Sequence, residues 1–338
     1  MQERTKVAEG SQLKKREACV RSSGTIAAVF RSLAMKNRQR RDILRLLGVS
    51  GVSFASGLWG CASTAPGSAP LSKPATPVAP PKDDFFFLQL SDTHWGFSGA
   101  ANPEAETTLR HAVATINSVA TRPDFVIFTG DLTHSTDDPA QRRERMKEFK
   151  SIVSELAVKD VRFIPGEHDA SLDGGEAYRE FFGATHYAFE HKELYFIALD
   201  NVSAPGAVLG DDQLAWLAAE VARVPKSRPL VVFAHRPLFE LFPSWDWATK
   251  DGARALEILQ QHPLVTVFYG HIHQEHTQQT GSITHRAARS LIFPMPKPGS
   301  VPKKAPLEWD PKSSDHGLGY REVALAASQL RVRDLPLK

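Results

Sequence analysis

Acidic residues and histidines follow five apolar segments of this sequence, at the point where each segment ends. In the central segment, residues 124–131, an apolar run leads into Gly130 and Asp131. Apolar runs of this length are typical of parallel strands covered on both faces, and ligands gather outside the carboxyl ends of such strands. The residues that follow the other four runs are Asp92 and His94, Glu167 and His168, His235, and His271 and His273. If the strands are parallel, these side chains share one rim and offer more ligands than one metal ion needs.

The spacing within two of these groups indicates how they could hold metal ions. Residues i and i+2 of an extended segment project to the same side, so each of the pairs Asp92 with His94 and His271 with His273 presents two ligands together. Two-metal sites hold their ions about 3.5 to 4 Å apart. Asp131 ends the central strand, and we expect its carboxylate to bridge the two ions.

Glu167 and His168 are adjacent, and adjacent side chains of an extended turn diverge. We therefore expect one of the two to bind metal and the other to face the substrate. Each signal is weak alone, because a lone histidine such as His235 is more often an ordinary core or surface residue. Because the same pattern follows five predicted strands, a joint metal site is favoured over five unrelated groups of structural residues.

Together these groups resemble the motifs of the calcineurin-like metallophosphoesterases. The motifs, found between residues 85 and 273, are Asp92-x-His94, Gly130-Asp131, Gly166-Glu167-His168-Asp169, His235 and Gly270-His271-x-His273. The resemblance implies an α/β fold, a two-sheet metallophosphoesterase sandwich flanked by helices, with two metal ions (Fe, Mn or Zn). By position, it implies that one ion is held by Asp92, His94, Asp131 and His273, and the other by Asp131, Glu167, His235 and His271.

The resemblance also implies a function, which is hydrolysis of a phosphomonoester or phosphodiester by a metal-bound hydroxide, with His168 contacting the scissile phosphate or the leaving group. Two branches fit best, the bacterial cyclic-nucleotide phosphodiesterases and the proteins similar to purple acid phosphatases. The chain departs from the family at Glu167, where asparagine is usual. The alternative is therefore a protein that binds metal and a phosphoester with little turnover.

Some aromatic and histidine side chains have two interpretations each. Trp245 and Trp247 could wall the substrate pocket or pack between sheets. His134, His285 and His316 could line the cleft or be ordinary loop histidines.

An export signal is predicted for residues 35–61, which begin with basic residues and continue into a weakly apolar run. Arg40 and Arg41 resemble the twin-arginine signature, so we expect the twin-arginine export machinery to be a partner. The alternative for this stretch is an amphipathic helix. Because Met35 opens a normal signal peptide, a misassigned start explains residues 1–34, which have no assigned role.

Cys61 ends a stretch that resembles a lipobox, although Trp59 departs from the small residue usual there. This predicts a membrane-anchored lipoprotein tethered through a lipid on Cys61, and an ordinary cleaved signal is the alternative. Residues 62–82 contain six prolines and are expected to form an extended tether. The expected location is periplasmic or otherwise extracytoplasmic.

Residues 83–338 are expected to form one metallophosphoesterase domain. Residues 1–61 hold 12 of the 41 Lys and Arg but only 4 of the 38 Asp and Glu, so the remaining chain is acidic. An acidic body predicts no nucleic-acid polymer as partner. Helices are expected at residues 103–120, 141–157, 211–224 and 250–261, a hairpin at 186–199, and an irregular loop at 294–311. After His273 we expect a second, mixed or antiparallel sheet that packs on the first.

Overall fold

The computed structural model describes residues 85–326 and 329–338. Residues 1–34, the export signal predicted for residues 35–61 with Cys61, and the tether predicted for residues 62–82 lie outside these described residues. Within the two described ranges, no helix has the length and apolar character needed to cross a bilayer.

The first sheet contains three parallel strands that lead toward the predicted ligands. They are β1 (Phe85–Leu90), β2 (Phe125–Thr129) and β3 (Val161–Ile164), connected by α1 (Ala105–Asn117) and α2 (Pro139–Val153). The last two described strands, β10 (Gly319–Ala326) and β11 (Gln329–Pro336), extend this sheet, because β10 pairs antiparallel with β1. The strand order is β11-β10-β1-β2-β3.

The second sheet begins with the predicted hairpin and has the order β4-β5-β6-β7-β9-β8. Its strands are β4 (Tyr187–His191), β5 (Leu194–Ala198), β6 (Leu230–Phe233), β7 (Val265–Tyr269), β8 (His276–Thr280) and β9 (Ile283–Ala287). β5, β6, β7 and β9 are parallel, while β4 and β8 run antiparallel at the edges. α5 (Asp211–Arg223) and α6 (Gly252–Leu259) connect the central strands.

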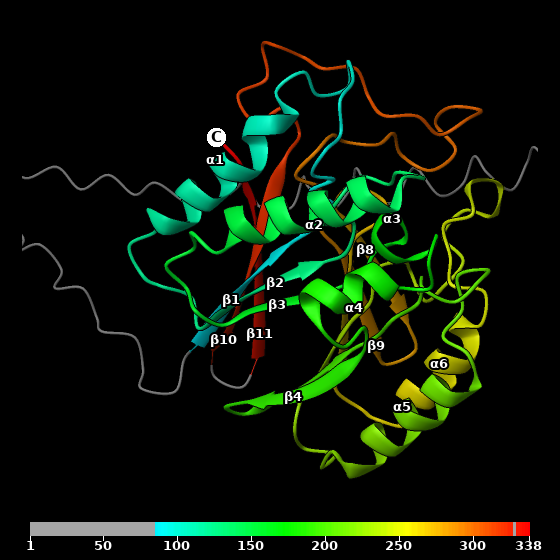
Figure 1. The fold of residues 1–338 in the computed structure, drawn as a ribbon. Coiled ribbons are helices and arrows are strands. Elements are labelled where there is room, and N and C mark those ends of the chain that lie inside the picture. Colours follow the sequence, from blue (N-terminus) through cyan, green and yellow to red (C-terminus); the bar gives the residue numbers. More distant parts are fainter. Residues whose placement is uncertain (1–84, 327–328) are drawn as a thin grey trace, which may run out of the picture. The chain divides into compact units, whose positions relative to one another are not determined.

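The two sheets face each other across a core rich in phenylalanine, and helices cover their outer faces (Figure 1). In the inner core Phe87 stacks on Phe125 at 4.7 Å, and its edge meets Phe196 and Phe233 from the second sheet. Residues of α1 and α2 pack on the first sheet, and residues of α5 and α6 pack on the second. The predicted two-sheet α/β sandwich flanked by helices is confirmed.

The predicted composition of the second sheet was wrong. The strands that carry the predicted ligands are divided between the sheets, with β1, β2 and β3 in the first and β6 and β7 in the second. The strands after His273 are divided as well, since β8 and β9 join the second sheet and β10 and β11 join the first. A fully apolar run can pair in either sheet, so hydrophobic periodicity does not identify its partner.

The expected helix at residues 141–157 starts two residues earlier than predicted. The Asp138 side chain accepts hydrogen bonds from the backbone N–H groups of Ala140 and Gln141, and Pro139 occupies the first helical turn. Both are favourable at a helix N-terminus. The region 288–318 contains no helix or strand, in agreement with the loop predicted at 294–311.

Candidate metal centre

The seven predicted metal ligands lie on loops beyond the carboxyl ends of β1, β2, β3, β6 and β7. Five of them have a left-handed backbone conformation with positive φ. They are Asp92 (55°), His94 (42°), Asp131 (49°), His271 (64°) and His273 (53°). The extended backbone expected for the i and i+2 pairs was therefore wrong. Positive φ costs a non-glycine residue about 1–3 kcal/mol. Hydrogen bonds between the loops offset this cost, for example from the His271 N–H to Asp92 Oδ1 at 3.0 Å.

Asp92, His94 and His273 form the first ligand cluster, with one ligand atom each within 4.8 Å of the others. His94 Nε2 lies 3.3 Å from His273 Nε2, and His273 Nε2 lies 3.4 Å from Asp92 Oδ1. All three side chains are buried. The two members of the pair His271 and His273 point to different clusters, so this pair straddles the centre.

Hydrogen bonds on the far side of each ring determine which nitrogen faces the first cluster. His273 Nδ1 lies 2.8 Å from the Phe293 carbonyl oxygen, which can only accept, so Nδ1 carries the proton. His94 Nδ1 lies 3.3 Å from His134 Nδ1, and a proton on His94 Nδ1 completes that contact. The two Nε2 atoms then direct lone pairs at each other and at a carboxylate. A cation between them removes this repulsion, so the donor set fits a metal ion.

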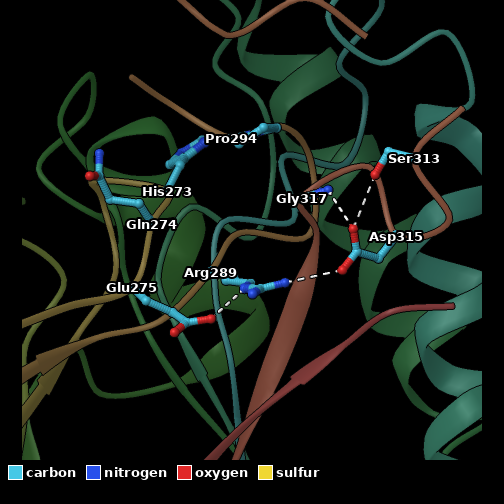
Figure 2. A pocket seen from close by; sticks show the side chains of 8 residues that line it. All are labelled: His273, Gln274, Glu275, Arg289, Pro294, Ser313, Asp315 and Gly317. Atoms are coloured by element: carbon cyan, nitrogen blue, oxygen red, sulfur yellow. Dashed lines mark hydrogen bonds and ion pairs between the residues drawn. The ribbon is translucent and has the colours of Figure 1, made fainter. Parts of the chain in front are cut away.

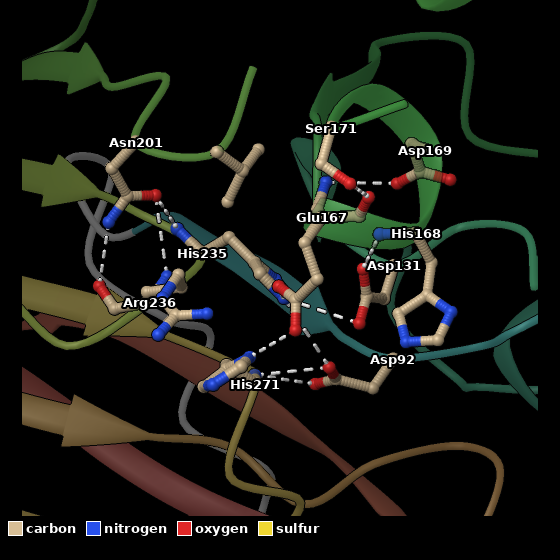
Figure 3. A network of polar contacts seen from close by, with 12 residues as sticks. Asp92, Asp131, Glu167, His168, Asp169, Ser171, Asn201, His235, Arg236 and His271 are labelled. Carbon is tan, nitrogen blue, oxygen red and sulfur yellow. Dashed lines mark hydrogen bonds and ion pairs between the residues drawn. The ribbon is translucent and has the colours of Figure 1, made fainter. Parts of the chain in front are cut away.

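Asp131, Glu167, His235 and His271 form the second ligand cluster (Figure 3). The Glu167 carboxylate spans the two histidines, with Oε2 2.9 Å from His235 Nε2 and Oε1 2.7 Å from His271 Nδ1. These pairs are close but poorly aligned. Among the described residues, Glu167 Oε2, His235 Nε2 and both His271 nitrogens lack a hydrogen-bond partner although they are buried. Convergent buried donors of this kind also fit a metal ion.

Asp131 lies between the two clusters. Its Oδ2 is 3.4 Å from both His94 Nε2 and His235 Nε2, while its Oδ1 accepts the His168 N–H at 2.9 Å. One oxygen is thus fixed by the backbone and the other faces ligands of both clusters. This is the geometry that a bridging carboxylate requires.

The pKa values in the second cluster show how strongly its charges interact. Burial raises the pKa of Glu167, but His271 and His235 outweigh burial and hold that pKa well below its ordinary value. Burial lowers the pKa of His235, but Asp131 and Glu167 outweigh it and raise that pKa well above its ordinary value. The carboxylates therefore demand positive charge here, which a proton or a metal ion can supply.

Glu167 and His168 begin α3 (Glu167–Ala170), a helical turn where the sequence predicted an extended one. Their side chains still diverge, because Glu167 joins the second cluster and the His168 ring lies 4.5 Å from the His94 ring. His168 Nδ1 accepts the Ser135 N–H at 3.2 Å. A neutral His168 therefore carries its proton on Nε2 and can donate it in a hydrogen bond.

His134 is partly buried beside His94 and His168, with ring centroids at 5.4 and 5.0 Å. Burial, with His168, lowers the pKa of His134 to about 4. A neutral His134 can accept the proton of His94 Nδ1, so it orients a predicted ligand. Of the two interpretations of His134, the one in which it lines the cleft fits this position beside a predicted ligand.

Two glycines of the motifs allow the loops to approach each other closely. A Cβ atom on Gly166 would lie 2.1 Å from Asp131 Oδ1, and one on Gly270 would lie 1.9 Å from Ser91 Oγ. Any side chain at these positions would displace a loop that carries predicted ligands.

Two further residues support the centre, although the sequence assigned a role to neither. The Asp169 carboxylate accepts hydrogen bonds from the N–H groups of Leu132, Thr133 and Gly166, and so joins the loop after β2 to α3. Asn201, fully buried, donates to the Arg236 carbonyl oxygen at 2.9 Å (Figure 3). Asn201 follows the apolar run of β5, a signal like those that identified the ligands.

Trp245 and Trp247 are 3% and 1% exposed and belong to an aromatic cluster with Tyr269 and Ile272. The packing alternative fits these positions, and a substrate contact does not, because almost none of either ring is accessible. His285 is fully buried in β9. His316 stacks on Trp309 at 3.8 Å in the region 288–318.

A hollow with a volume of about 430 Å³ borders His273 (Figure 2). Arg289 crosses it and forms ion pairs with Glu275 at 2.5 Å and Asp315 at 3.2 Å. Gln274 and Ser313 also line it. Charged and polar side chains line this hollow together with Pro294 and Gly317.

The chain matches the model of the calcineurin-like phosphoesterase family over residues 87–275. It is 30% identical over 230 residues to a probable cyclic nucleotide phosphodiesterase of Rhodococcus erythropolis, covering 63% of this chain and 73% of that protein. It is 27% identical over 231 residues to the 3′,5′-cyclic adenosine monophosphate phosphodiesterase CpdA of Pseudomonas aeruginosa, covering 63% of this chain and 78% of that one.

Among solved structures, the fold is similar to that of a dimetal phosphatase from Danio rerio. The TM-score is 0.55 at 16% identity, and the match covers 75% of this chain and 96% of the other. At this identity the similarity concerns the fold alone.

Proposed function

Because the chain belongs to the calcineurin-like phosphoesterase family and is thus a metal-dependent phosphoesterase, we propose that it hydrolyses phosphodiesters, with cyclic nucleotides as the substrate class, at a centre of two metal ions. The observation that carries the proposal is the position of Asp131 Oδ2, 3.4 Å from a histidine of each ligand cluster. Asp92, His94 and His273 complete one set of ligands, and Glu167, His235 and His271 complete the other.

When bound, two such ions lower the pKa of a water molecule toward about 7 and attract the phosphoryl oxygens. The protein's residues fix the geometry of this chemistry. His235 and His273 donate from Nδ1 to the carbonyl oxygens of Thr129 and Phe293, so in the neutral ring the lone pair that a metal can bind is on Nε2. The buried position of both rings excludes bulk water from the ligand side.

His168 is proposed to donate a hydrogen bond from Nε2 to a phosphoryl or leaving-group oxygen. The Ser135 N–H is donated to Nδ1, so Nε2 is the ring nitrogen left to face the substrate. A hydrogen bond from Nε2 would stabilise developing negative charge.

Charge and space both support a diester. Asp92, Asp131 and Glu167 offset three of the four positive charges of two divalent ions, one more than if residue 167 were asparagine. The lower net charge penalises a dianionic monoester more than a singly charged diester. A diester also needs space for two ester groups, and the hollow beside His273 is next to the centre.

The test compares bis(p-nitrophenyl) phosphate, 3′,5′-cyclic AMP and p-nitrophenyl phosphate as substrates of protein loaded with Mn²⁺, Zn²⁺ or iron. We expect diester turnover to exceed monoester turnover, and Glu167→Asn to shift this ratio toward the monoester. Monoester preference with no shift in Glu167→Asn would contradict the charge argument, unless metal analysis gives one Fe³⁺ per centre, which restores the missing charge. Stoichiometric metal without turnover of any ester would favour the binding-protein alternative.

Export is the second part of the proposal. The twin-arginine pair Arg40 and Arg41 and the lipobox-like stretch at Cys61 support a periplasmic protein held at a membrane by a lipid. A twin-arginine route carries folded proteins, which would allow metal loading before export.

A further inference from the structure

Two cationic side chains, Arg236 and Lys304, are fastened to consecutive residues of one turn. These residues are the last residue of η2 (Pro243–Trp245), a short 3₁₀-helix, and the residue after it. Lys304 Nζ donates to the Trp245 carbonyl oxygen at 2.8 Å, and Arg236 Nη2 lies 3.1 Å from Asp246 Oδ2 and also contacts the Asp246 carbonyl oxygen. Because Trp245 and Asp246 are neighbours, the two cations lie close together.

Arg236 connects this pair of cations to the second ligand cluster. It directly follows His235, and Figure 3 draws its side chain on the His271 side of Glu167, opposite His168. Burial lowers the pKa of Lys304 while Glu167 raises it, so the ammonium and the Glu167 carboxylate interact electrostatically. Lys304 therefore brings positive charge to the side of the centre where Glu167 adds negative charge.

The Lys304 side chain is suited to a ligand contact and Arg236 is not. The Arg236 side chain is 7% exposed, and its guanidinium is held by the Ala248 carbonyl oxygen, through Nε, and by Asp246. Lys304 is half-buried in the irregular region 288–318. Its ammonium has three N–H donors, and the Trp245 carbonyl takes one of them. Its flexible four-carbon stem lets the remaining donors follow a ligand.

We propose that Lys304 is a specificity-determining residue that binds a phosphoryl oxygen of the substrate beside Glu167 and offsets part of the charge of that carboxylate. This inference rests on the proposed function, because it concerns the phosphoester of the same site. Hydrogen bonds between an ammonium and a phosphate oxygen are charge-assisted and stronger than neutral ones. The competing explanation is that Lys304 only ties the irregular loop to the Trp245 turn.

The test measures binding of inorganic phosphate to metal-loaded protein by titration calorimetry, with metal content determined for each sample. Lys304→Gln should bind phosphate about 10-fold more weakly, as expected for one lost charge-assisted hydrogen bond. Lys303→Gln, a change at the exposed neighbouring lysine, should bind it like the wild type. Lys304→Arg should recover most of the affinity. In turnover of the diester, Lys304→Gln should raise KM more than it lowers kcat.

The outcomes separate this inference from the proposed function. Equal phosphate affinity in Lys304→Gln, Lys303→Gln and wild type would overturn the inference and leave the function intact. A lower melting temperature in Lys304→Gln with unchanged phosphate affinity would assign Lys304 the loop-tying role and also overturn it. Phosphate binding that depends on Lys304 in a wild-type protein without any esterase activity would support the inference and contradict the function.

Discussion

Asp131 is the residue on which both ligand clusters depend. Its Oδ2 faces His94 and His235 at equal distances of 3.4 Å, and no other carboxylate of the centre has histidines of both clusters this near. Asp92, by comparison, lies 3.4 Å from His273 but 4.0 Å from His235. The two acids should therefore differ in how many ions they hold.

We expect Asp131→Ala to lower the occupancy of both metal positions and Asp92→Ala to lower mainly one. Elemental analysis of folded, purified protein would measure this as ions per chain. Asp137→Ala, a change of the same kind at an exposed residue of the same loop, serves as the control. Two ions per chain in folded Asp131→Ala protein would rule out the bridging role.

His168 allows chemistry to be separated from metal binding, because its two ring nitrogens have different roles. Asparagine places an acceptor near the position of Nδ1 but has nothing at Nε2, whereas glutamine extends an amide nitrogen toward the Nε2 position. We expect His168→Asn to lower kcat by about 10²- to 10⁴-fold, the usual range for such a group, and His168→Gln to retain more activity. Metal content should stay near that of the wild type in both. Parallel losses of metal and activity would make His168 a ligand instead.

At the scale of helices and strands, the sequence predicted most elements because their apolar patterns are clear. The short apolar runs predicted a strand before each group of ligands, where β1, β2, β3, β6 and β7 lie, and the chemistry of the residues after them predicted the ligands. Strand partners were not predictable, since a run that is apolar on both faces fits either sheet. The left-handed backbones at the ligands were also missed, because aspartate and histidine, although enriched at positive φ, signal it far more weakly than glycine does.

Contacts made by unconnected segments were equally hidden in the sequence. Asp169 was part of a motif, but its bonds to Leu132 and Thr133 depend on the placement of α3 against the loop after β2. Lys304 gave no signal at all, because its contact with the Trp245 carbonyl oxygen results from the path of an irregular loop. Such residues become visible only when the elements are assembled.

His285 in β9 should make the stability of the folded protein depend on pH. It is fully buried, its ring packs against Phe239 at 4.9 Å, and neither ring nitrogen has a hydrogen-bond partner among the described residues. Burial, with His276, lowers the pKa of His285 to about 4. The unfolded chain, with an ordinary histidine pKa of 6.5, then takes up a proton at higher pH than the folded protein does.

The free energy of unfolding should therefore be highest above pH 6.5, where His285 is neutral in both states. It should decrease as the pH falls toward 4. The loss amounts to about 3 kcal/mol of unfolding free energy at the acid end. Urea unfolding of metal-free protein at several pH values between 7.5 and 4.5 would measure it. His285→Leu should flatten this dependence, and His316→Leu, in the irregular loop, should not. The same acid slope in wild type and His285→Leu would show that His285 does not titrate in this way.

For the whole molecule, the division of the ligands between two sheets means that metal binding joins both halves of the sandwich. β1 and β2 supply Asp92 and Asp131, while β6 and β7 supply His235 and His271 to the same centre. A ligand that binds only the folded state stabilises it by mass action. Metal loading before export would thus produce a more stable cargo.

Export itself is tested on the intact chain. Replacing both Arg40 and Arg41 with lysine should retain the protein in the cytoplasm, because the twin-arginine receptor reads the arginine pair. Cys61→Ser should release an exported protein from the membrane fraction. Fractionation and immunoblotting would measure both, with the wild-type protein as the reference. Unchanged membrane association of Cys61→Ser would remove the lipid anchor.

The pairing of β1 with β10 means that the first sheet is completed long after β1 has been synthesised. Arg321 of β10 contacts Gln89 of β1 across 232 residues of sequence, so β1 leaves the ribosome long before its partner has been made. During that interval the β10 edge of β1 is unpaired, and an unpaired strand edge invites association with other chains. Asp92 directly follows β1. The first sheet, and with it the setting of this ligand, can therefore be completed only late in synthesis, and a nascent chain stalled before β10 is the form most exposed to aggregation.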